Sequence, residues 1–122
     1  MAGLWFEDFA EGMVFDHALR RSVTEADNMW FCNATLNTQP LHIDFDFAAG
    51  TEFGRPLVNS IFTLGLMIGI SVSETTQGTT LGNLGMTDVA FPHPVFHGDT
   101  ISARTTRSEE RRVGKECFLL CR

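Results

Sequence analysis

The stretch LVNSIFTLGLMIGISV, Leu57 to Val72, decides the fold. Apolar residues occupy nearly every helical face of this stretch, and a helix that is apolar all round is buried. A helix of about 15 residues is shorter than the ~20 residues that cross a bilayer, so we predict a core helix wrapped by a sheet. Gly65 and Gly69 have the spacing of a membrane dimer motif, but the same spacing allows strands to approach the helix closely, which we prefer.

The segments on both sides of this helix predict an antiparallel sheet. Four of them have the polarity and flanking turn residues of strands: 4–15, 17–23, 79–91 and 95–106. A short helix over residues 26–34 should begin after the N-cap Thr24 and bury Met29 and Trp30. A second short helix should follow from Phe45, with Asp44 as its cap. Strands, a helical insert, one long helix and further strands describe an α+β fold in which a sheet curls round the helix.

Length and charge narrow the class of protein. A chain of 122 residues with a net charge of −6 is one small acidic domain, whereas a nucleic-acid binder needs clustered Lys and Arg. The acidic charge does not exclude an anionic small molecule as ligand, because a few local cations or backbone N–H groups suffice to bind it. The cysteines have no zinc or disulfide spacing, and the N-terminus has acids where a signal peptide has bases. We expect a cytoplasmic protein without nucleic-acid or membrane partners.

Basic residues become much more frequent after residue 106. Four of the nine Lys and Arg residues precede residue 107, and five lie in the last sixteen residues. Twelve of the fifteen Asp and Glu residues precede residue 107, so the net charge is 4 − 12 = −8 before this point and 5 − 3 = +2 after it. The segment RSEERRVGKEC, residues 107–117, resembles the translation of a common sequencing adapter. A solvated helix is the alternative. We predict an incomplete domain over residues 1–106 and a non-native tail over residues 107–122.

Residues 36–44, LNTQPLHID, resemble the hydratase motif of the MaoC-like family, Asp-x-Asn-Pro-Leu/Ile-His-x-Asp. Two further similar blocks follow in the same order, RPLV at 55–58 and PVFHGD at 94–99. The resemblance spans residues 25–105 and depends on the order and spacing of these blocks. It implies a hot-dog fold, an antiparallel sheet wrapped round a long buried helix, which here lacks its C-terminal strands and is therefore truncated.

The resemblance implies that water is added to, or removed from, the α,β position of an acyl-CoA, without any cofactor beyond the CoA of the substrate. His42 is the expected base, because imidazole titrates near neutral pH. The backbone N–H of Ser60, at the start of the long helix, is the expected donor to the enolate oxygen. Asn37 stands where the family has a catalytic aspartate, and its amide can orient a water but cannot accept the proton.

The stretches Leu-Asn-Thr-x-Pro-Leu-His and Pro-Leu-Val-Asn-Ser resemble members of the family that act as mesaconyl-CoA hydratases and β-methylmalyl-CoA dehydratases. This placement implies a short, branched dicarboxylic acyl-CoA as substrate. Pro40, Arg55 and Asn59 are the candidate substrate-binding residues. Arg55 suits a carboxylate or a CoA phosphate, and an ordinary ion pair with Glu52 is the alternative. The family also implies a homodimer.

Other interpretations remain open at this point. His42 could be a structural histidine, and the protein could be a non-catalytic acyl-CoA-binding module, for which Asn37 is the best argument. A thioesterase is disfavoured because the matching block has no second carboxylate beside His42. We predict no metal at His93 and His97, whose spacing suits a metal only on a helix that the neighbouring prolines prevent.

Overall fold

The computed structural model describes residues 3–108 of the chain. Their contacts divide them into two compact units. The motif unit comprises Arg21–Leu66 and Phe91–Ile101, and the flanking unit comprises the residues up to Arg20, Met67–Ala90 and the residues from Ser102. Both units contain a short antiparallel pair of strands, so the α+β class with antiparallel pairing is confirmed.

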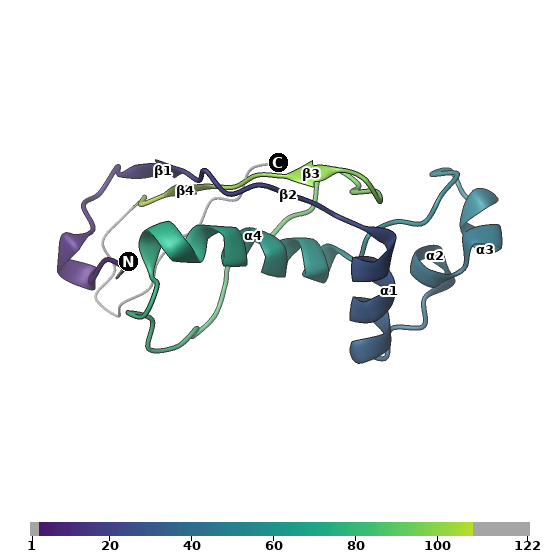
Figure 1. The fold of residues 1–122 in the computed structure, drawn as a ribbon, viewed down its shortest axis with the longest axis horizontal. Helices are drawn as coiled ribbons and strands as arrows, with labels where there is room; N and C mark the ends of the chain where they lie inside the picture. Colours follow the sequence, from purple (N-terminus) through teal and green to yellow (C-terminus); the bar gives the residue numbers. More distant parts are fainter. Residues whose placement is uncertain (1–2, 109–122) are drawn as a thin grey trace. The chain divides into compact units, whose positions relative to one another are not determined.

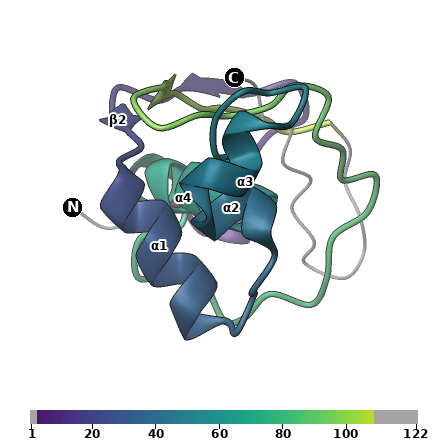
Figure 2. The same ribbon diagram turned by 90° about the vertical axis from the view of Figure 1, so that its right-hand side faces the viewer.

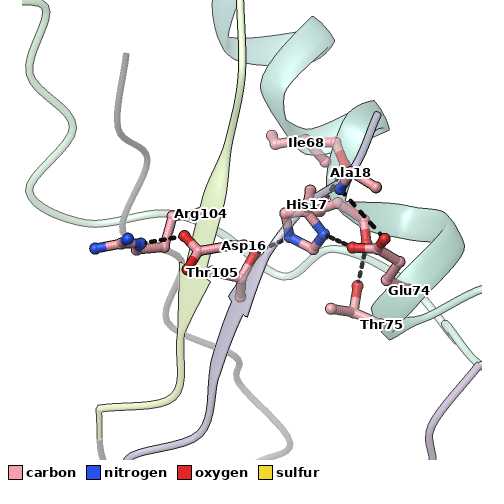
Figure 3. Close-up of polar contacts among 9 residues, drawn as sticks. Asp16, His17, Ala18, Ile68, Glu74, Thr75, Arg104 and Thr105 are labelled. Atoms are coloured by element: carbon pink, nitrogen blue, oxygen red, sulfur yellow. Dashed lines mark hydrogen bonds and ion pairs between the residues drawn. The ribbon is translucent and has the colours of Figure 1, made fainter. Parts of the chain in front are cut away.

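The flanking unit pairs strand β1, Val14–Asp16, with strand β4, Arg104–Thr106 (Figure 1). The 3-10 helix η1, Phe6–Asp8, precedes β1. His17 follows β1 directly, and its ring lies between the Glu74 carboxylate and the Thr105 hydroxyl, at 2.5 and 2.8 Å (Figure 3). Burial of this ring is compatible with its polarity because both ring nitrogens have a partner.

The motif unit pairs strand β2, Arg21–Ser22, with strand β3, Thr100–Ile101. Val23 extends this pairing, since its N–H donates to Asp99 and its carbonyl accepts from Gly98. Three of the four predicted strands, over residues 4–15, 17–23 and 95–106, are therefore present only as short pieces. A strand persists only where its backbone groups find a partner.

Three short helices belong to the motif unit: α1, Glu25–Ala34; α2, Pro40–Ile43; and α3, Phe45–Ala49 (Figure 2). Thr24 is the N-cap of α1 as predicted, with a reciprocal capping box to Asp27. Burial opposes ionisation of Asp27, but the Arg21 guanidinium at 2.7 Å and the Thr24 groups outweigh it and lower the pKa of this carboxyl. The start of α1 is thereby fixed.

The buried face of α1 differs from the prediction. Asn28 and Cys32 are buried, whereas Trp30 is 68% exposed and Met29 is only half-buried. The prediction placed apolar residues inward, but Asn28 and Cys32 form the inward pair because they are one helical turn apart and hydrogen-bond to their surroundings. Cys32 is thus a small residue of the core.

The predicted strand over residues 79–91 is wrong. The described chain has no regular secondary structure there, and the side chain of Leu81 is fully exposed. Two conformations with positive φ, at Gly85 and Asp88, interrupt the extended backbone. No strand among the described residues pairs with this segment, so its backbone cannot form a ladder.

The long helix α4, Ser60–Thr75, begins three residues later than predicted and ends three later. Ile70 is buried, but Ile61 is 57% exposed, and Gly65 and Gly69 are exposed. The prediction of burial on every side is therefore wrong for this face. In the part of the chain that the structure describes, no helix is long and apolar enough to span a membrane.

The first residue after the predicted boundary at 106 still takes part in the sheet of the flanking unit. Arg107 donates its N–H to Met13 and accepts from Gly12. Residues 109–122, most of the predicted tail, lie outside the described residues. The tail and the domain boundary remain predictions.

Candidate active site

The end of α1 places Asn37 through a Schellman motif. The N–H of Asn37 donates to Cys32 and that of Leu36 to Asn33, which satisfies the last carbonyls of the helix. The motif requires a left-handed residue, and Leu36 supplies it with φ of 57°. Asn37 then forms an Asx turn, in which its Oδ1 accepts from the N–H of Gln39 at 3.0 Å. Its Nδ2 is the side-chain donor left to face a water.

Pro40 begins α2 at the position where its missing N–H costs nothing. Gln39 before it is extended, with ψ of 117°, as expected for a residue that precedes proline. The carbonyl of Pro40 accepts from Asp44, which is the N-cap of α3 as predicted. Pro40 thus positions the next turn of the chain, which carries His42.

His42 lies on α2 with its Nδ1 2.7 Å from the backbone oxygen of Leu57. A carbonyl oxygen can only accept, so Nδ1 carries the hydrogen. In the neutral ring Nε2 then has a free lone pair. This is the tautomer that a base acting through Nε2 requires.

The start of α4 carries the other predicted residues. Asn59 is 6% exposed, and its Oδ1 accepts from the N–H of Ile61 at 3.0 Å, which caps the helix. Its Nδ2 lies 3.8 Å from the sulfur of Cys32. Ser60 is the first residue of α4, so its N–H has no acceptor within the helix. That group can donate to an anionic oxygen.

Arg55 is exposed, and its guanidinium carbon lies 3.8 Å from the centre of the Phe96 ring. The alternative ion pair with Glu52 is wrong, because among the ion pairs of residues 3–108 none joins these two side chains. A guanidinium stacked on a ring keeps its N–H edge available to an anion.

Two residues of this cluster were not predicted, Asn28 and His97. Asn28 is completely buried and hydrogen-bonds to the backbone of His42, Leu57 and Asn59. The ring nitrogen Nε2 of His97 lies 3.1 Å from Asn28 Nδ2. A helix-interior Asn is a weak sequence signal for such a role, because Asn favours caps and turns over helix interiors.

All six predicted site residues lie in the motif unit, and hydrogen bonds connect some of them. Asn28 connects the backbones of His42 and Asn59, whereas no hydrogen bond of the described residues joins Asn37 to His42. Residues 3–108 contain no group of three or more metal-binding side chains. The arrangement offers one imidazole base, a carboxamide donor and a free helix N–H, which together suit proton transfer beside a carbonyl group.

A family model described as MaoC like domain matches residues 8–118. The chain belongs to the MaoC-like family. The match continues beyond residue 106, into the predicted tail, and does not by itself decide where the tail begins. Relatives of the chain in this family are hydratases and dehydratases of acyl-CoA thioesters.

The chain is 28% identical over 116 residues to the 3-hydroxybutyryl-CoA dehydratase of Methylorubrum extorquens, covering 89% of this chain and 69% of that protein. It is 30% identical over 104 residues to the mesaconyl-CoA hydratase of Haloarcula marismortui, covering 85% of this chain but 29% of that protein. The solved structure of a monoamine oxidase regulatory protein from Archaeoglobus superposes with a TM-score of 0.78 and 33% identity. That match covers 89% of this chain and 73% of the other. These similarities support the hot-dog assignment.

Proposed function

We propose that this MaoC-like chain adds water to, or removes it from, the α,β position of an acyl-CoA thioester, with His42 as the base. The observation that carries the proposal is the bond between His42 Nδ1 and Leu57 O, because it leaves Nε2 unprotonated in the neutral ring. The hydratases and dehydratases among the relatives support the same reaction class.

In the hydration direction, His42 Nε2 takes a proton from water as the water oxygen bonds to the β-carbon. The electrons of the carbon–carbon double bond move toward the thioester, and the carbonyl oxygen becomes an enolate oxygen. The N–H of Ser60 donates to that oxygen, and Asn37 Nδ2 holds the attacking water. The α-carbon then takes a proton from the imidazolium, which restores neutral His42. Dehydration is the reverse sequence.

The finer proposal is that the substrate is a short, branched dicarboxylic acyl-CoA. Arg55 would pair with the distal carboxylate, because its guanidinium is held on Phe96 and has no carboxylate partner among the described residues. Asn59 and Pro40 would contribute to substrate binding indirectly, because they position the backbone at the starts of α4 and α2. The similarity to a mesaconyl-CoA hydratase supports this choice.

The test compares loss of the enoyl thioester absorbance with crotonyl-CoA and with mesaconyl-CoA. We expect turnover by the wild-type chain and loss of at least about 100-fold in kcat for His42→Ala. His93→Ala, which removes an exposed histidine, is the matched control and should keep its activity. Near-wild-type turnover by His42→Ala would refute the assignment of the base.

Arg55→Gln tests the substrate class separately. It should raise KM for mesaconyl-CoA by about 10-fold or more and leave KM for crotonyl-CoA nearly unchanged. An equal effect on both substrates would place Arg55 on the CoA moiety.

A non-catalytic acyl-CoA-binding module is the second candidate, because Asn37 replaces a carboxylate that the family motif has at this position. Calorimetric binding of crotonyl-CoA without any turnover would favour it. We further propose that the protein is a homodimer and lies in the cytoplasm. Sedimentation at micromolar concentration tests the homodimer.

A further inference from the structure

Asn28 has a polar side chain at a position of the fold that does not require one. It lies in the middle of α1 with 0% exposure. Asn is a poor helix former, and burial of a carboxamide is unfavourable unless its groups are hydrogen-bonded. An apolar residue at this position would give the helix a simpler contact with the core. The hydrogen-bond partners of the Asn28 carboxamide should therefore show why a polar residue is buried here.

The partners fix the orientation of the carboxamide. The backbone N–H of Asn59 can only donate, so the atom facing it at 3.0 Å is Oδ1 of Asn28. Nδ2 then lies 3.0 Å from the oxygen of Leu57 and 3.2 Å from that of His42. Both are carbonyl oxygens and can only accept. A flipped amide would place its oxygen against two acceptors, so only one orientation is compatible with these neighbours.

Asn28 is connected to His42 in two ways. It donates directly to the backbone oxygen of His42. It also donates to Leu57 O, which is the acceptor of His42 Nδ1 at 2.7 Å. A carbonyl oxygen has two lone pairs, and the two donors together use both. Asn28 thus helps to hold the Leu57 carbonyl that accepts from the His42 ring, together with the bond from the Val58 N–H of the same peptide group to Val95 O at 2.9 Å.

The same side chain also reaches the start of α4. Its Oδ1 accepts from Asn59, the residue directly before Ser60. One carboxamide therefore aligns the base and the helix end that offers the Ser60 N–H.

We propose that Asn28 is a positioning residue, which holds His42 as the Nδ1-protonated tautomer and fixes the start of α4 relative to it. Its effect on catalysis rests on the proposed hydratase function. Its effect on the His42 ring does not, because the ring can be observed without turnover.

Two substitutions separate positioning from folding. Asn28→Ser removes the reach of the side chain to Leu57 and Asn59. Asn28→Asp has nearly the same shape and keeps the acceptor for Asn59, but places a carboxylate oxygen against two carbonyl oxygens and beside Nε2 of His97, which lies 3.1 Å from Asn28 Nδ2. This buried carboxyl should bind a proton more readily than an exposed one, and the protonated form can donate one of the two lost bonds. Asn33→Ser, at an exposed position of the same helix, is the matched control.

The first measurement is a long-range ¹H–¹⁵N spectrum of the histidine rings in the full chain. We expect the neutral ring of His42 to be protonated at Nδ1 in the wild type and in Asn33→Ser. In Asn28→Ser it should become a mixture of both tautomers. A folded Asn28→Ser protein with unchanged His42 ring signals would overturn the proposal, whether or not the chain is a hydratase.

The second measurement is hydration of crotonyl-CoA as a function of pH. Asn28→Asp should lose about 10- to 100-fold in kcat near neutral pH with less than about a twofold change in KM. Its rate relative to the wild type should rise as the pH falls, because the new carboxyl becomes a donor. A ratio that does not change with pH would overturn the proposal even if Asn28→Ser failed to fold. If the wild type shows no turnover, the proposed function fails, and the ring spectra decide the positioning role alone.

Discussion

The side-chain oxygen of Asn37 accepts a hydrogen bond from the backbone N–H of Gln39 at 3.0 Å. This bond stabilises the turn between α1 and α2 and leaves Nδ2 as the group that can hold water. An aspartate at this position would keep the acceptor for Gln39 and supply a second oxygen that accepts a proton or a water hydrogen.

Asn37→Asp should therefore fold like the wild type and retain or increase kcat for hydration of crotonyl-CoA. The comparison of kcat with that of Asn37→Ala is informative, since the alanine loses both the turn bond and the water ligand. A kcat of Asn37→Asp below that of Asn37→Ala would show that a carboxylate is unfavourable in this site.

The N–H of Ser60 can be removed without a change in the helix. Ser60→Pro lacks this N–H, yet proline is tolerated at the first position of a helix. If the N–H stabilises the enolate oxygen, kcat should fall by about 100- to 1000-fold, the typical effect of losing one such donor.

Ser60→Gly is the matched control for this substitution. It keeps the N–H and should retain kcat. Equal activity of Ser60→Pro and Ser60→Gly, with equal circular dichroism, would exclude the Ser60 N–H from the reaction.

Local signals were read correctly from the sequence where one residue decides the outcome. Thr24 caps α1 and Asp44 caps α3, as predicted, because each cap depends on a few neighbouring backbone groups. Strand prediction over residues 79–91 failed because a strand also needs a partner, which periodicity does not reveal.

In the candidate site too, features that depend on neighbouring residues were predicted, and features that depend on distant contacts were not. The prediction placed Ser60 at the start of the long helix, as the structure has it. Asn28 was missed because its role follows from contacts with residues 14 to 31 positions later in the chain. Left-handed Leu36 was also not predictable, since glycine or asparagine is the usual sign of that conformation.

Leu36 should therefore be a favourable place for glycine. Its φ of 57° is costly for a residue with a Cβ, and its side chain is 86% exposed, so little apolar burial is lost on replacement. We expect Leu36→Gly to increase the free energy of unfolding by up to about 1 kcal/mol, as measured by urea denaturation.

The control for this prediction is Leu81→Gly. Leu81 is fully exposed, and it is absent from the residues with positive φ in the described chain. Glycine there should leave stability unchanged or lower it slightly, because it only adds freedom to the unfolded chain. A stabilisation of equal size at both positions would show that conformation at Leu36 is not the cause.

Glu74 should contribute to stability in a pH-dependent manner. The hydrogen bond from the His17 ring, and then that from the Ala18 N–H, lower the pKa of Glu74 from its ordinary value of 4.5 (Figure 3). A carboxyl whose pKa is lower in the folded state stabilises the fold above the pKa of the unfolded state. That contribution is lost as the pH falls from about 4.5 through the lower folded value.

Glu74→Gln should remove this dependence. The urea midpoint of the wild type should fall more steeply between about pH 5.5 and 3.5 than that of Glu74→Gln, because glutamine does not titrate there. The difference should be modest, since the Glu74 side chain is 36% exposed and solvent weakens the interaction. Glu52→Gln, at an exposed carboxyl, is the control and should retain the wild-type slope. If Glu74→Gln and Glu52→Gln gave the same slope, the bond between His17 and Glu74 would contribute nothing to acid stability.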